Sequence, residues 1–191
     1  MNNYEYIIAS LPLISASDRT LPDTDAIIGE IRNALGARDA ASLDFVLSIY
    51  DSATDPADFY GKATVSKSAF IRDYFGYDLN VKNTKVGYLN KALDRPEGTD
   101  IVLPSEEEFE DRAKVLEILS GKDILARERA LDELMWNKAD ELTVLHIFDL
   151  DVILGFVVRL KIIDRWAKLD ENAGREFFRK LVNEIRNNRT I

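Results

Sequence analysis

The apolar run from Leu142 to Ile163 constrains this chain more than any other feature of its sequence. It has the length of a membrane span, but one histidine and four charged residues interrupt it: His146, Asp149, Asp151, Arg159 and Lys161. Because a spanning helix needs about 20 nearly uncharged residues, we expect a buried core segment instead. From about residue 149, apolar side chains occupy almost the whole circumference of a helix for two turns. This pattern is typical of a central helix that other helices cover.

The rest of the sequence repeats apolar residues at helical spacing, and few segments alternate with the period of two that marks a strand. Helices are predicted over these approximate ranges: 22–36, 39–50, 66–93, 105–120, 123–142, 149–168 and 171–187. Residues 51–62 are predicted to be a loop, and residues 4–12 are too few to assign. The sequence therefore predicts an all-α fold, a bundle of about six to eight helices. It forms either one domain or two closely packed lobes, 1–95 and 105–191, with a linker at 96–104.

Local signals refine these helices. Ser105 and Glu108 have the spacing of a capping box, which predicts that a helix begins at Ser105. The predicted core positions of that helix are Phe109, Ala113, Leu116 and Leu119. In the next helix, Leu131, Leu134 and Met135 are predicted to face inward. Gly76 and Gly87 are points where the long helix at 66–93 could bend or break.

Charge is distributed unevenly along the chain. The net charge is −9, which disfavours nucleic acid and anionic lipid as partners. Residues 1–154 carry 16 basic and 29 acidic side chains, whereas residues 155–191 carry 9 basic and 5 acidic ones. The basic end either complements an acidic partner or pairs within the fold. No cysteine is present, which suits a reducing compartment, and the first residues lack the basic region of a signal peptide.

Motifs for chemistry are not evident. His146 is the only histidine and has no cysteine with which to share a metal, so we interpret it as a partly buried structural residue. Asp149 and Asp151 fit the start of the next helix, where the helix dipole favours acids. No phosphate-binding glycine motif and no Gly-x-Ser-x-Gly elbow occurs. We therefore expect no cofactor and no catalysis by this chain alone; an enzyme of unrecognised type would need carboxylates converging on His146.

A polar strip follows the apolar part of the helix at 149–168. It consists of Lys161, Asp164, Arg165 and Lys168, which share one side of a helical wheel. The apolar residues around it are explained by a bundle core alone. If the chain binds partners, the basic residues Lys161, Arg165 and Lys168 are candidates for docking.

Three segments carry a resemblance to a known family. They are Tyr4 to Pro12, Tyr77 to Asn83, and Leu160 to Asp170 with Gly174 and Phe178 after it. Together they resemble a short bacterial family whose genes lie among those for V-type ATPase subunits. The departures are Glu5 within the tyrosine cluster, Lys82 in place of arginine, and Arg159 in place of lysine.

The resemblance implies a shortened counterpart of the C-type subunit of V-type ATP synthases, an all-helical protein that seats the rotating central stalk on the membrane ring. It implies a non-catalytic, cytoplasmic, peripheral subunit that couples stalk rotation to ion translocation without entering the membrane. Its partners would be the central stalk and the membrane ring, with Tyr4 and Tyr6 as further docking candidates. The chain is shorter than this full-length counterpart, so a complete socket is not implied. The alternative is a free-standing helical adaptor or regulator.

Overall fold

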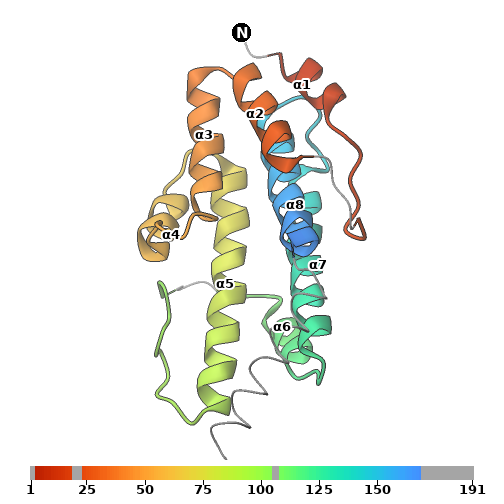
Figure 1. Cartoon of the computed structure of the whole chain (residues 1–191). Coiled ribbons are helices and arrows are strands. Elements are labelled where there is room, and N and C mark those ends of the chain that lie inside the picture. The colour runs from red at the N-terminus through yellow and green to blue at the C-terminus, as the bar shows by residue number, and fades with distance from the viewer. Residues whose placement is uncertain (1–2, 19–22, 105–107, 169–191) are drawn as a thin grey trace, which may run out of the picture.

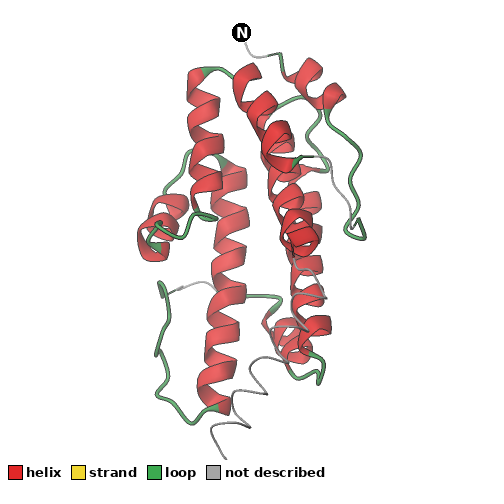
Figure 2. Ribbon diagram, viewed as in Figure 1, coloured by secondary structure: helices red, strands yellow, loops and turns green. Residues whose placement is uncertain are grey.

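The computed structural model describes residues 3–18, 23–104 and 108–168, and these residues form helices and loops without a strand (Figure 2). Their helices are α1 (Tyr4–Ser10), α2 (Thr24–Ala34), α3 (Ala37–Ser48), α4 (Pro56–Thr64), α5 (Ala69–Ala92), α6 (Arg112–Leu119), α7 (Ile124–Thr143) and α8 (Leu150–Lys168). The predicted all-α fold is confirmed. The predicted helix at 171–187 lies outside the described residues.

Helix α8 has the central position that its composition predicts. Every residue from 153 to 158 is buried. Its main partner is α7, and it also contacts α1, α2, α3 and α5. Figure 1 shows α8 beside α7, with the long α5 running in the same general direction. Because α8 is apolar on all sides, it can be removed from water only by neighbours from both ends of the sequence.

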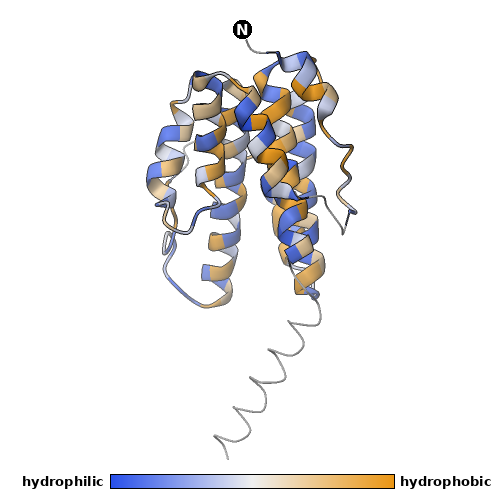
Figure 3. Ribbon diagram, turned by 45° about the horizontal axis from the view of Figure 1, so that its top comes forward, coloured by the Kyte–Doolittle hydropathy of each residue, from blue (hydrophilic) through white to orange (hydrophobic). Residues whose placement is uncertain are grey.

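Helix α5 is the longest described helix, with 24 residues, and it remains helical through Gly76 and Gly87. Ser68 caps its first turn by accepting a hydrogen bond from the backbone N–H of Ile71. Phe70, Tyr74 and other residues of its inner face pack into the core. It contacts α4, α6, α7 and α8, so elements on both sides of the predicted linker share one hydrophobic core. Figure 3 shows hydrophobic and hydrophilic residues alternating along the helices of this bundle.

The linker after α5 is held by two amide side chains of that helix. Asn90 Nδ2 donates to the Thr99 carbonyl at 2.7 Å, and Asn83 Nδ2 donates to the Leu103 carbonyl at 2.9 Å. Gly98 lies between these two contacts with φ of +84°, a conformation that glycine adopts without steric cost. These contacts tie the loop back along α5 (Figure 1).

Two predicted boundaries are wrong. Residues 51–62 were expected to be a loop, but α4 begins at Pro56, and Asp55 caps it by accepting from the Ala57 N–H at 3.3 Å. Proline at the first position of a helix is favourable because its missing N–H would have no partner there. Residues 4–12 also include a short helix, α1, capped by Asn3.

The predicted capping box does not start a helix. Ser105 lies outside the described residues, Glu108 and Phe109 are not helical, and α6 begins only at Arg112. The inward residues of α6 are Val115 and Leu119, whereas Ala113 and Leu116 are exposed. The later start leaves only two helical turns, and contact with α5 selects which side of them is buried. In α7, Leu131, Leu134 and Met135 face inward as predicted.

Gly155 marks the closest approach between α7 and α8. A Cβ atom at this position would lie 2.6 Å from Thr143 Cγ2. The Thr143 side chain is fixed because its hydroxyl donates to the Ala139 carbonyl at 2.8 Å. We expect Gly155→Ala to lower the free energy of unfolding by about 1–3 kcal/mol through overpacking, measured by urea denaturation.

Gly87→Ala is the matched control, because a Cβ there would meet nothing within 4 Å. It should raise the free energy of unfolding by about 0.5–1 kcal/mol through helix propensity. Adding Thr143→Ser, which removes Cγ2 but keeps the hydroxyl, should restore much of the stability that Gly155→Ala loses. Equal stabilities of the two alanine variants would contradict the close contact.

Candidate docking surfaces

The polar strip of α8 is built around a carboxylate of α7. Asp132 accepts hydrogen bonds from the Arg165 guanidinium and from Trp166 Nε1, the latter at 2.5 Å. Arg129 lies over the Trp166 ring, 4.1 Å from its centroid. Burial raises the pKa of Asp132, while Arg165 and the Trp166 N–H oppose that shift. The two donors therefore stabilise a carboxylate in a mostly buried position, and that carboxylate fixes the direction of Arg165.

The other two basic residues of the strip have different surroundings. Lys168 pairs with Asp164 at 2.8 Å and is well exposed. Lys161 is half-buried and lies over the Tyr50 ring, 5.8 Å from its centroid. It makes no ion pair within the residues that the structure describes. Two of the three predicted docking cations are thus already paired, and Lys161 is the one whose charge is available.

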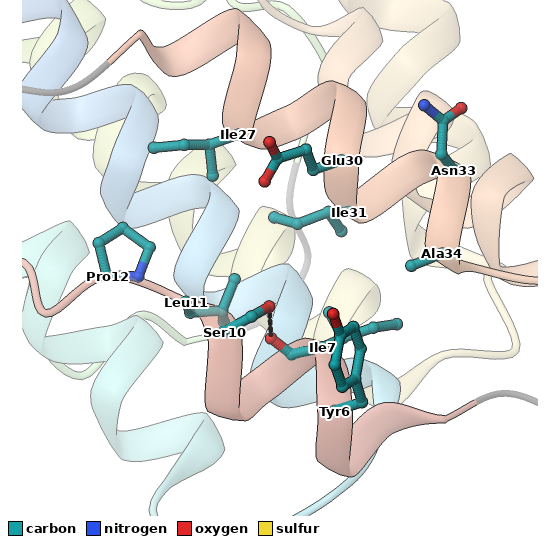
Figure 4. Close-up of a pocket in the computed structure, with 10 residues that line it drawn as sticks. All are labelled: Tyr6, Ile7, Ser10, Leu11, Pro12, Ile27, Glu30, Ile31, Asn33 and Ala34. Carbon is teal, nitrogen blue, oxygen red and sulfur yellow. Dashed lines mark hydrogen bonds between the residues drawn. The ribbon is translucent and has the colours of Figure 1, made fainter.

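The two tyrosines of α1 lie in different environments. The Tyr4 hydroxyl donates to Asp39 of α3, which joins α1 to the bundle. Tyr6 is exposed and lies at the edge of a hollow of about 550 Å³ between α1 and α2 (Figure 4). We call this the α1–α2 hollow.

The α1–α2 hollow is lined by side chains of both helices and of the turn after α1: Tyr6, Ile7, Ser10, Leu11, Pro12, Ile27, Glu30, Ile31, Asn33 and Ala34. Glu30 is the only charged residue among them. Figure 4 shows Glu30 and Asn33 on α2, across from the Tyr6 ring. A hollow of this size and mostly apolar lining suits an apolar side chain or a small ligand.

The predicted environment of His146 is wrong. We expected a partly buried imidazole, but His146 is exposed in the connection between α7 and α8. Its Nδ1 lies 2.5 Å from Asp149 Oδ2, while Asp149 Oδ1 accepts from the Val152 N–H at 3.2 Å. Asp149 thus lies at the start of α8 as predicted. Among the described residues, no group of three or more histidines or acids is arranged to hold a metal.

The most exposed apolar surface was missed by sequence reasoning. Residues 144–148, which we call the apolar connection, place four large side chains in water: Val144, Leu145, Ile147 and Phe148, with 52–91% of each residue exposed. The sequence analysis assigned them to the buried core because they adjoin the apolar half of α8. Asp149 is the signal that separates them, since an N-cap residue marks where the chain turns into a new helix.

None of the helices in the described ranges combines the length and the apolar character needed to cross a bilayer. This agrees with the interpretation of 142–163 as something other than a membrane span.

Comparisons with known proteins are sparse. The model of a family described as a protein of unknown function (DUF2764) matches residues 100–189, just under half of the chain. The matched region contains α6, α7 and α8, and therefore both the polar strip and the apolar connection. No curated protein and no solved structure matches the chain.

The pair of His146 and Asp149 gives a direct test of the connection's geometry. The hydrogen bond from Asp149 raises the pKa of His146 above 6.5. A raised pKa means that the folded state holds the proton more tightly than the unfolded state. The resulting stabilisation is therefore complete below about pH 6.5 and is lost as the pH rises through the folded-state pKa.

Because His146 is the only histidine, its imidazole NMR signals are unambiguous. We expect a titration midpoint above 6.5 in the native chain and a return toward 6.5 in Asp149→Asn. A midpoint unaffected by that substitution would show that the pair does not form.

Proposed function

We propose that this chain is a non-catalytic helical subunit that docks onto other proteins. The observation that carries this proposal is the apolar connection at 144–148, where four large apolar side chains are exposed within five consecutive residues. Contiguous apolar surface of this kind is typical of protein–protein interaction sites. A stable monomer would gain nothing from leaving these side chains in water.

The position of this surface supports a bridging role. The apolar connection precedes the first turn of α8, and the polar strip occupies the last two turns of the same helix. With 19 residues, α8 is roughly 28 Å long. Its middle is buried and in contact with five other helices. Two partners bound at its ends would thus be joined by a packed, stiff element.

We further propose that the partners are subunits of a V-type ATP synthase or ATPase. The resemblance of the segments at 4–12, 77–83 and 160–170 to the ATPase-associated family supports this assignment. In this role the chain is a cytoplasmic, peripheral subunit between the central stalk and the membrane ring, and it couples stalk rotation to ion translocation. Long helices such as α5, α7 and α8 suit a part that transmits torque.

A free-standing helical adaptor is the second candidate. The α1–α2 hollow favours it, because it offers a further binding surface on elements outside the region that the family model matches. Coding sequences without ATPase genes around them would support the adaptor over the ATPase subunit.

Removing the exposed apolar groups tests the docking role. We expect Leu145→Ser with Ile147→Ser to weaken partner binding by more than about tenfold, as loss of a desolvated hot spot does, without lowering the melting temperature. The measurement is recovery of V-type ATPase subunits with the tagged chain in mild detergent. Leu13→Ser with Leu93→Ser is the control, since both leucines are exposed elsewhere.

Full recovery with the connection variant would remove the apolar connection as the docking surface. If the unaltered chain recovers no ATPase subunit, the ATPase assignment falls.

Charge reversal tests the polar strip, and the structure decides which residue to use. Arg165 is unsuitable because a glutamate there would face Asp132 and disturb the fold. Lys168 is suitable: it is 68% exposed, and Lys62 forms a similar pair with Asp58 at 63% exposure. We expect Lys168→Glu and Lys62→Glu to cost the fold a similar few tenths of a kcal/mol.

Only Lys168→Glu should lower the yield of the complex, and the loss should grow at low salt because exposed charges act mainly on association. Equal yields for the two variants would dismiss Lys168 as a docking residue.

A further inference from the structure

Lys161 introduces an unbalanced positive charge where α8 meets the segment after α3. Lys82 pairs with Asp78 at 2.9 Å, and Arg165 pairs with Asp132. Lys161, over the Tyr50 ring, makes no ion pair within the part of the chain that the structure describes. These neighbouring groups therefore comprise three cations and two carboxylates.

Two tyrosine hydroxyls beside this charge lack an acceptor. Tyr74 is only 3% exposed, and among the described residues its hydroxyl makes no hydrogen bond. The Tyr50 hydroxyl has no partner there either. Leaving the donor of so buried a residue without an acceptor costs free energy, so such a group is expected to meet an acceptor in the working state of a protein.

Other tyrosines of this chain show which acceptor the fold uses. Tyr60 donates to Asp78 at 2.5 Å, Tyr77 donates to Asp111 at 2.7 Å, and Tyr4 donates to Asp39. In each case the acceptor is a carboxylate. Tyr50 and Tyr74 are the counterparts for which the described residues provide none.

The two unpartnered hydroxyls share one neighbourhood. Burial is the main cause that raises the pKa of each, and the presence of Tyr50 raises the pKa of Tyr74 further. Asp78 and Asp132 act on both hydroxyls, and Arg165 acts on Tyr50 in the opposite direction. Effects between so many groups require them to lie close together. Tyr50 is 46% exposed, so this neighbourhood is open to solvent on the Tyr50 side.

We propose that Lys161, Tyr50 and Tyr74 form a binding site for a single carboxylate, supplied by an acidic side chain of a partner protein. The ammonium of Lys161 provides the charge, and the two hydroxyls donate hydrogen bonds to the carboxylate oxygens. One unpaired cation matches one negative charge, whereas Asp78 and Asp132 oppose a dianion such as phosphate. The proposal deepens the docking role of Lys161 and rests on that role for the identity of the occupant.

The test uses the full chain with tyrosine labelled by ¹³C at Cζ, the carbon that bears the hydroxyl. Tyr50→Phe and Tyr74→Phe assign the two signals. The probe is N-acetylglutamate α-amide, and N-acetylglutamine α-amide is its neutral isostere. We expect the glutamate probe to shift the Tyr50 and Tyr74 signals in a saturable way, and the glutamine probe to leave them unchanged.

Lys161→Gln should weaken binding of the glutamate probe by at least about tenfold, because it removes the charge-assisted interaction. Lys62→Gln, on an exposed pair elsewhere, should leave binding unchanged. No saturable shift, an equal shift with the neutral probe, or equal binding by Lys161→Gln would each overturn the carboxylate site.

The probe experiment and the recovery of ATPase subunits fail independently. Probe binding without recovery of ATPase subunits keeps the carboxylate site and rejects the ATPase assignment. Recovery of ATPase subunits without probe binding keeps the docking role and rejects the site.

Discussion

The burial of α8 on all sides is the constraint on which the rest of the structure depends. A helix with one apolar face needs one neighbour, but residues 153–158 are buried around the whole circumference. Helices α1, α2 and α3 from the beginning of the chain, and α5 and α7 from the middle, supply that cover. Gly155 permits the closest of these contacts, since any side chain there would meet Thr143. The fold is thus organised from its penultimate segment outward.

Sealing the middle of α8 leaves its two ends for interaction. At one end the chain leaves α7 through the apolar connection, whose side chains are outside the packed helices. At the other end, Asp132 holds Arg165 and Trp166 in place, so the strip around Lys161 has a defined geometry. The same packing that buries α8 therefore provides the rigid link between the two proposed docking surfaces.

Helices with clear end signals were predictable. Asp23 before α2, Ser68 before α5 and Asp123 before α7 each accept hydrogen bonds from the first turn, and all three helices lie where their apolar periodicity places them. Prediction was wrong where local signals compete. A capping-box spacing at Ser105 did not begin a helix, while Asp55 and Pro56 began one inside a predicted loop. Local hydrogen bonds are worth little alone, and packing decides which helix starts are used.

The sequence by itself determined the helical class, the central role of α8 and the basic strip near its end, because these follow from spacing within a single segment. Only the tertiary structure decided that Arg165 and Lys168 are paired while Lys161 is not, and that Tyr74 is buried without an acceptor. It also decided that the apolar residues at 144–148 are exposed. Such outcomes depend on groups from distant parts of the chain. Periodicity shows which side of a helix is apolar, but burial and charge pairing depend on what other segments bring to that side.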